Sequence, residues 1–113
     1  MNKAPAAVNV FLGILMFIIC IPSFNGSISP NKYAGFRMKK AYESEENWYK
    51  INRYGAQQQM LWASGIFLTG IGCLFVSERF LKNRIIFCVL LIGPCFVGII
   101  IPSLQTIAFA KGL

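Results

Sequence analysis

The side chains suited to acid–base or nucleophilic chemistry are few in this chain: four carboxylates and four thiols, without a single histidine. Glu45 and Glu46 are neighbours, and neighbouring side chains on a helix point about 100° apart, so they cannot face each other as an acid–base pair. Glu43 and Glu46 could share a helix face, but no partner base accompanies them, and Glu78 stands apart. We interpret these carboxylates as solvated, and we expect no enzymatic activity.

The four thiols all lie within long apolar runs, where cysteine behaves as a small hydrophobic residue. They are Cys20, Cys73, Cys88 and Cys95. No C-x-x-C pair occurs, and neither histidine nor aspartate is present to complete a metal site. We expect no disulfide, no metal and no cofactor.

One polar stretch, residues 30–55, contains residue types at spacings that suit recognition of a partner or ligand. Its sequence is PNKYAGFRMKKAYESEENWYKINRYG. One hypothesis is that Arg37 and Arg53 pair with Glu45 or Glu46, because a planar guanidinium suits a carboxylate. In that arrangement Trp48 would fill the helix bundle. A solvated linker is the alternative, although the spacing favours an ordered element. The candidate ligand-binding or structural residues are Pro30, Asn31, Gly35, Phe36, Arg37, Glu45, Glu46, Trp48, Asn52, Arg53 and Gly55.

The apolar runs on either side of this stretch are long enough to hold it at a membrane surface. The chain has 113 residues, of which 56% are hydrophobic and 13% charged, and its mean hydropathy of +0.57 is too high for a soluble domain. About 20 helical residues cross a hydrocarbon core of about 30 Å. We predict a single all-α integral membrane domain over 1–113, with transmembrane helices at about 6–24, 56–77 and 85–110.

A cleaved secretory signal is an alternative interpretation of the first apolar run. Lys3 precedes the run, and the small residues Ser23, Gly26 and Ser27 lie near its end. The run is long for a signal peptide, however, and no A-x-A cleavage site follows it. A mature mass lacking roughly the first two dozen residues would identify cleavage.

An amphipathic interfacial helix is predicted between the first and second transmembrane helices. Ser44 suits the N-cap position, and Glu46 and Lys50 are spaced for an i,i+4 ion pair. Before this helix, Gly35 permits a positive φ. The sequence leaves open whether the helix continues into the membrane or kinks at Gly55. Four aromatic residues suit an interfacial belt: Trp48, Tyr49, Tyr54 and Trp62.

Small residues in the second transmembrane helix indicate a close approach by a neighbouring helix. Gly65, Thr69 and Cys73 repeat at a spacing of four, and the helix also contains Ser64, Gly70 and Gly72. In the third transmembrane helix, Pro94 and Pro102 predict a kink or a tilt.

The net charge of +7 could suggest nucleic-acid binding, but in so apolar a chain we expect the basic residues to face the lipid bilayer, with no nucleic-acid partner. Three crossings put seven basic residues on the side of the polar stretch: Lys32, Arg37, Lys39, Lys40, Lys50, Arg53 and Lys111. The other side receives four: Lys3, Arg79, Lys82 and Arg84. The positive-inside rule therefore places the polar stretch in the cytoplasm and the N-terminus outside.

The polar stretch resembles the signature of the SdpI family of small bacterial membrane proteins. The family pattern is roughly PN-x-x-x-G-[IF]-R-T, a short gap, then N-E-E-x-W-x-x-x-[HN]-R-x-x-G, with one helix before it and two after. This chain departs from that pattern at four positions. Met38 stands where the family usually has threonine, Lys39 where proline is frequent and Ser44 where asparagine precedes the glutamates, and Gly55 comes one residue early.

The resemblance implies an immunity protein that protects its cell from a membrane-active peptide toxin, a form of bacteriocin resistance. It also implies that such a protein can take part in signal transduction by sequestering a transcriptional autorepressor at the cell membrane. The alternative is a transport or lipid-handling component. No side-chain charge lies within the apolar runs, which disfavours ion or proton pathways. The sequence does not identify the toxin or the oligomeric state.

Overall fold

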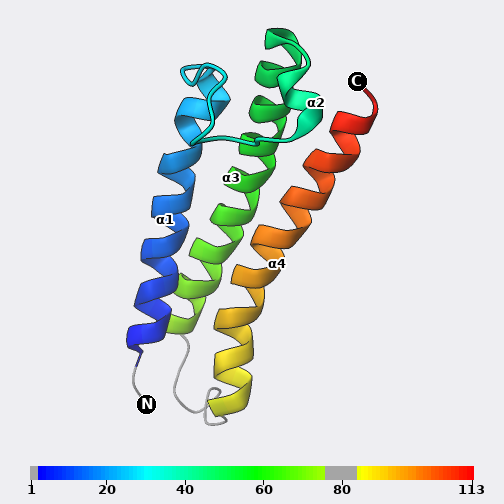
Figure 1. The fold of residues 1–113 in the computed structure, drawn as a ribbon. Helices are drawn as coiled ribbons and strands as arrows, with labels where there is room; N and C mark the ends of the chain where they lie inside the picture. Colours follow the sequence, from blue (N-terminus) through cyan, green and yellow to red (C-terminus); the bar gives the residue numbers. More distant parts are fainter. Residues whose placement is uncertain (1–2, 76–83) are drawn as a thin grey trace.

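The computed structural model describes residues 3–75 and 84–113 of the chain. It contains helices α1 (Ala4–Asn25), α2 (Lys39–Tyr42), α3 (Glu45–Phe75) and α4 (Arg84–Lys111), as Figure 1 shows. Three of them, α1, α3 and α4, are long and apolar enough to cross a membrane, and the described residues contain no strand. The predicted all-α membrane fold is confirmed. Glu78, Arg79, Lys82 and the end of the predicted 56–77 span lie outside the described residues.

The long helix α3 is the centre of the bundle. It packs against α1 on one side and α4 on the other, whereas α1 and α4 contact each other only slightly. The bundle is elongated, with principal extents of 54 × 23 × 18 Å. The loop after α1, the short helix α2, the start of α3 and the end of α4 all lie at the same end of the bundle (Figure 1). This arrangement brings the polar stretch over the ends of the membrane helices.

Helix α1 ends at Asn25, one residue beyond the predicted span of about 6–24, and Gly26 caps it. Pro22 lies inside the last turn, and Gly26 adopts a left-handed φ of 75°. The amide of Ser27 donates to the Pro22 carbonyl at 2.9 Å, and the amide of Gly26 donates to Ser23 at 3.4 Å. This is the pairing of a Schellman motif, which satisfies carbonyls left open at a helix end.

Helix α3 begins where its capping residue predicted and passes through Gly55 without interruption. The hydroxyl oxygen of Ser44 accepts a hydrogen bond from the amide of Asn47 at 3.0 Å, which satisfies one of the free donors of the first turn. The predicted ion pair between Glu46 and Lys50 is also present, at 2.7 Å. The interfacial segment and the second membrane span are therefore one continuous helix.

Two glycines set the close packing of α1 on α3. A Cβ atom on Gly13 would come within 2.8 Å of the Ala63 carbonyl, and one on Gly70 would come within 2.8 Å of the Ala6 carbonyl. Cys73 is also buried against Ala6. The expectation for Gly65 and Gly72 is wrong, because a Cβ atom on either would meet nothing within 4 Å. The face of α3 that packs closely is the one covered by α1. The spacing of small residues alone did not show which face that would be.

The prolines of α4 lie inside the helix, and the carbonyl that one of them leaves open receives a side-chain donor. Pro102 has no amide hydrogen to give to the carbonyl of Gly98. The Nε2 group of Gln59 donates to that carbonyl at 2.7 Å. Nearer the other end of α4, the Nδ2 group of buried Asn9 donates to the Leu91 carbonyl at 2.8 Å. These two amides join α4 to α3 and to α1 within the apolar body.

Candidate functional site

The polar stretch folds into an ordered unit, which we call the motif cap and define as residues 26–55. Its centre is Asn52, which is only 3% exposed. The Oδ1 atom of Asn52 accepts a hydrogen bond from the Phe36 amide at 2.6 Å, and its Nδ2 group donates to the Trp48 carbonyl at 2.9 Å. One side chain thus joins the loop to α3. A buried amide with both groups paired stabilises the structure that it joins, because unpaired buried polar groups are costly.

Gly35 lets the loop approach Asn52 closely enough for this bond. Its φ is 96°, as the sequence predicted, and this is a region that other residues avoid. A Cβ atom at this position would lie 2.5 Å from the Oδ1 atom of Asn52 and 3.3 Å from the Trp48 ring. Glycine is therefore required here for both its backbone conformation and its lack of a side chain.

Trp48 is completely buried beneath the loop and beside the end of α4. Its indole Nε1 group donates to the Ile28 carbonyl at 3.0 Å, so its polar group is paired. It belongs to a buried cluster with Ala41 of α2, Ile51 of α3 and Ala110 of α4. Trp48 thus fills the bundle end, and the alternative that it anchors an interfacial aromatic belt is wrong because a belt residue must be exposed to lipid.

The last turn of α4 closes the cap from the side. Ala110 is buried against the Trp48 cluster, and the ring of Phe109 stacks on Tyr54 with a centroid distance of 4.3 Å and an interplanar angle of 6°. Aromatic pairs of this kind add to the effect of apolar burial. The motif cap is therefore held in place by the end of α4 as well as by contacts within residues 26–55.

Gly55 owes its place to packing against the ring of Phe36. A Cβ atom on Gly55 would overlap Cε2 and the neighbouring ring atoms of Phe36. The helix continues through this position. The role of Gly55 is therefore to leave room for the Phe36 ring of the loop, which packs directly on the backbone of α3. The hinge that the sequence left open is not present.

Asn31 shapes the turn before Gly35. Its Oδ1 atom accepts hydrogen bonds from the amides of Tyr33 and Ala34, both at 2.7 Å, which is how asparagine typically stabilises a turn. The hydroxyl of Tyr42 donates to the Asn31 carbonyl at 2.6 Å, which links the turn to α2. Pro30 is exposed immediately before it. The turn presents Tyr33 outward, with 90% of its surface exposed.

The hypothesis that the two arginines pair with glutamates is wrong. Arg37 donates from its guanidinium to the Lys32 carbonyl. The Nε group of Arg53 donates to the Phe24 carbonyl at 3.2 Å, and its guanidinium carbon lies 6.0 Å from the centre of the Phe24 ring. Both arginines therefore hold backbone carbonyls of the loop and of α1, because those oxygens lie nearer than the carboxylates.

Glu46 instead pairs with Lys50, one helical turn away on the same helix. The hydrogen bond and the charge of Lys50 lower the pKa of the fully exposed Glu46 carboxyl. Glu45 is exposed at the start of α3, where a negative charge is favourable to the helix dipole. The carboxylates in the described part of the chain thus form no acid–base pair, and the same residues contain no group of three or more potential metal ligands.

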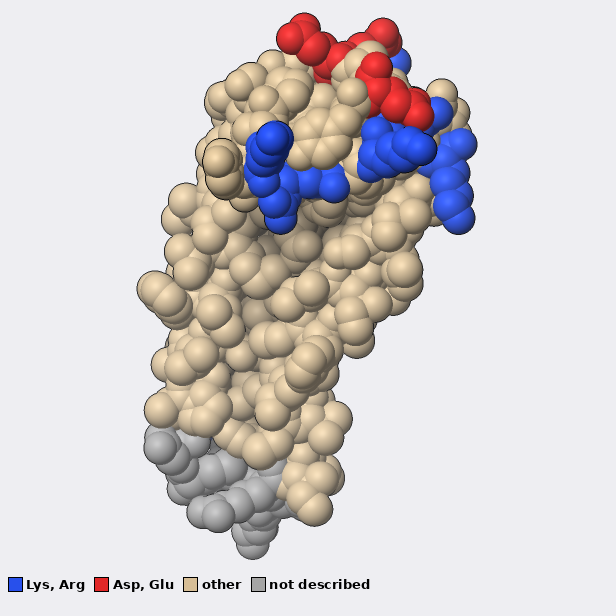
Figure 2. All heavy atoms as spheres, in the orientation of Figure 1, with Lys and Arg blue, Asp and Glu red and all other residues tan. Residues whose placement is uncertain are grey.

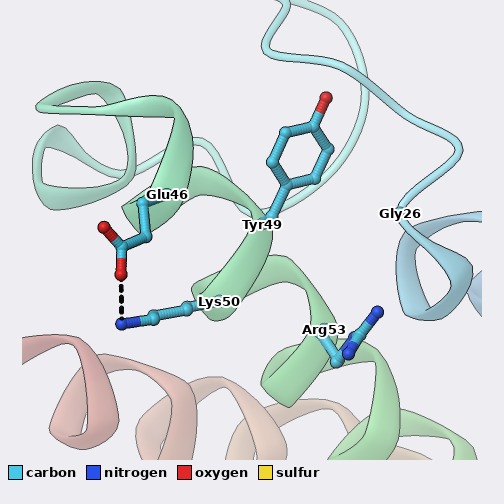
Figure 3. Close-up of a pocket in the computed structure, with 5 residues that line it drawn as sticks. All are labelled: Gly26, Glu46, Tyr49, Lys50 and Arg53. Carbon is cyan, nitrogen blue, oxygen red and sulfur yellow. Dashed lines mark ion pairs between the residues drawn. The ribbon is translucent and has the colours of Figure 1, made fainter.

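An open polar pocket lies on the α1 side of the motif cap. Its volume is about 480 Å³, and it is lined by Gly26, Glu46, Tyr49, Lys50 and Arg53, which Figure 3 shows. On the face shown in Figure 2, basic side chains gather in a band directly above the apolar body, with acidic side chains beyond them. The surface can therefore bind anionic or polar groups at the edge of the apolar layer.

Sequence analysis missed the two membrane amides, Asn9 and Gln59. A signal was present for each, because a polar side chain within an apolar run usually has a partner. Asn9 is the only amide residue between positions 4 and 24, and Gln59 ends a run of three glutamines. The carbonyl partners could not be named, since they depend on how α4 lies against its neighbours.

The fold and the motif cap together define a class of small polytopic helical membrane proteins in which the segment between the first two spans folds back onto the bundle end. A family model, the SdpI/YfhL protein family, matches residues 27–104. This range covers nearly the whole cap and most of α4, and the chain belongs to this family, which is not a known enzyme family. Searches among curated proteins and among solved structures gave no match.

Proposed function

We propose that the protein is a non-catalytic membrane protein of the immunity type, which protects its cell from a membrane-active peptide and also binds a regulator such as a transcriptional autorepressor. Membership of the family supports this role. The observation that carries the proposal is that the polar stretch is an ordered cap with buried Asn52 and Trp48 at its centre. A rigid surface of this kind binds a partner with little loss of conformational entropy.

Tyr33 is the residue that we propose for the centre of the contact. It is 90% exposed and sits on the turn that Asn31 stabilises. A large aromatic ring held by a rigid turn is typical of residues that dominate binding energy. Exposed Lys32 and Arg37 lie beside it in the chain and would add attraction for an acidic partner.

We also propose that the motif cap faces the cytoplasm and that the N-terminus lies outside. The seven basic residues of the predicted cytoplasmic side all belong to the motif cap or to the last residue of α4. In the positive-inside rule, an excess of lysine and arginine marks the cytoplasmic side. A regulator in the cytoplasm could then reach Tyr33 directly, and a membrane-active peptide would reach it after entering the bilayer and crossing to the cytoplasmic side.

Survival of a sensitive bacterial host challenged with candidate secreted peptides tests the function. Cells expressing the protein should survive a peptide dose that kills cells without it. Tyr33→Ala and Arg37→Ala should each reduce protection, while Glu43→Gln, at an exposed position of the same cap, should not. Unchanged protection in both of the first two variants, at equal protein levels in the membrane, would refute the proposed contact.

Reconstituted vesicles separate this role from that of a transport or lipid-handling component. Saturable binding of the protective peptide without solute or lipid flux is the expected result. Flux of a substrate that depends on the protein would instead support the transport alternative.

A further inference from the structure

The polar pocket beside Gly26 lies at the level where lipid headgroups meet the protein. Helix α1 has 22 residues, so at the standard rise it is about 33 Å long, close to the thickness of about 30 Å of a hydrocarbon core. Gly26, the first residue after α1, is therefore at the membrane surface. The pocket formed by Gly26, Tyr49, Lys50 and Arg53 opens at that depth.

Two cations of this pocket have capacity for an anion. Arg53 uses only its Nε group within the described part of the chain, so both terminal guanidinium nitrogens are free to donate. Lys50 is turned toward Glu46 and away from Arg53 (Figure 3), and its side chain is 51% exposed. An exposed pair of this type contributes little energy, so a phosphate can compete with Glu46 for the ammonium group.

Two apolar hollows continue from this pocket along the groove between α1 and α3. The upper hollow has a volume of about 230 Å³ and includes Phe17, Phe24 and Ser64. The lower hollow, of about 330 Å³, shares Phe17 and Ser64 with it. The guanidinium of Arg53 lies over the Phe24 ring, so the charged pocket and the upper hollow adjoin.

The length of the groove matches one leaflet of a bilayer, headgroups included. Arg53 at the charged pocket and Leu68 at the far end of the lower hollow are 15 residues apart on α3 (68 − 53), which corresponds to about 22 Å along the helix axis. Half of a bilayer with its headgroup regions is about 20–22 Å. A chain that starts at the charged pocket and follows the groove would therefore end near the bilayer midplane.

We propose that this groove is a binding site for one anionic phospholipid. The lipid phosphate would contact the guanidinium of Arg53 and, once Lys50 turns from Glu46, the Lys50 ammonium group, and one acyl chain would lie in the hollows between α1 and α3. With two cations and one carboxylate, the pocket is net positive, which favours an anionic over a zwitterionic headgroup. The site does not depend on the proposed immunity function.

Native mass spectrometry of the purified protein tests the headgroup part of the site. Phosphatidylglycerol should be retained roughly tenfold better than phosphatidylcholine with identical acyl chains, because both lipids carry the phosphate but only phosphatidylcholine adds a choline cation, which Lys50 and Arg53 repel. Lys50→Gln and Arg53→Gln should each remove most of this preference. Lys39→Gln, which removes the same charge elsewhere on the cap, should preserve it. Glu46→Gln should strengthen retention, because it releases Lys50 from its present partner.

The acyl-chain part of the site needs its own variants. Ser64→Phe should fill the shared section of the two hollows and reduce phosphatidylglycerol retention without a change of charge, and Leu68→Trp provides a second test if that variant fails to fold. Inorganic phosphate and glycerophosphoglycerol, which lack acyl chains, should not displace the lipid at equal concentration. If they displace it, the site binds a free phosphate group and not a lipid.

Equal retention of the two lipids, or retention that is insensitive to Lys50 and Arg53, would overturn the proposal. If no lipid is retained and Ser64→Phe abolishes binding of the protective peptide, the groove is a peptide site, which also overturns it. The survival assay with Tyr33→Ala addresses a different surface, so the two proposals can fail independently.

Discussion

Replacing Asn52 by alanine should detach the loop from α3 while the membrane helices persist. The substitution removes the acceptor of the Phe36 amide and the donor to the Trp48 carbonyl. The amide would be left unpaired in a partly buried place, which costs about 1–3 kcal/mol, and loss of the second bond adds about 0.5–1.5 kcal/mol. The Trp48 carbonyl keeps its helical partner. We expect the closed cap to lose about 2–4 kcal/mol.

Hydrogen exchange in detergent micelles or nanodiscs measures this loss at the Phe36 amide. Since about 1.4 kcal/mol corresponds to a tenfold change in an equilibrium constant, exchange at Phe36 should accelerate roughly 30- to 700-fold in Asn52→Ala. Tryptic cleavage after Lys32 and Arg37 should accelerate in parallel. Amides in the middle of α1 and α4 should exchange as before.

Asn47→Ala is the matched control on the same helix. The Nδ2 group of Asn47 donates to the Lys40 carbonyl at 3.3 Å, a longer bond near the surface, so its loss should change loop exchange by less than about fivefold. If Asn52→Ala and Asn47→Ala give the same loop exchange, the assignment of Asn52 as the centre of the motif cap is refuted.

Gly55→Ala should lower the unfolding free energy of the cap by about 1–3 kcal/mol in thermal or denaturant unfolding, because the new methyl group overlaps the aromatic ring above it; an unchanged midpoint would contradict this packing. Gln59→Leu should destabilise the bundle by about 0.6–2 kcal/mol, since the Gly98 carbonyl loses its donor. Replacing Pro102 by alanine restores a backbone donor to this carbonyl and should reduce the cost of Gln59→Leu. The pKa of Glu46 is lowered by Lys50, so the stabilisation from this pair is present above the unfolded pKa and is lost as pH falls through the lower folded value. A pH titration of the carboxyl by NMR should show the lowered pKa in the parent protein and its return toward the ordinary range of a glutamate in Lys50→Gln.

The elements of the fold could be predicted because each depends on signals that lie close together in the chain. Uninterrupted apolar runs indicate the three long helices. Ser44 and the Glu46–Lys50 pair act within one or two turns, and Gly35 acts through its own backbone. All three local features are present in the structure as the sequence predicted.

The partners of the candidate site could not be predicted in the same way, because they depend on three-dimensional placement. Arg53 contacts the carbonyl of Phe24, 29 residues earlier, and that oxygen is available only because α1 ends at Asn25. The choice of Gly70 over Gly65 as the close-packed glycine likewise depends on the side of α3 that α1 covers. The sequence was therefore enough to identify the residues of the candidate site, but the contacts that they make required the structure.

The position of Ala110 and Phe109 against the Trp48 cluster has a consequence for biogenesis. A ribosome makes the chain from its N-terminus, so α1, the loop and most of α3 exist before the final turn of α4 is synthesised. Until that turn has been made and α4 has inserted into the bilayer, the tryptophan lacks part of its cover. Closure of the surface that we propose for binding is therefore a late event of assembly, and chains arrested before α4 should be recognisable to membrane quality-control proteases by an accessible loop.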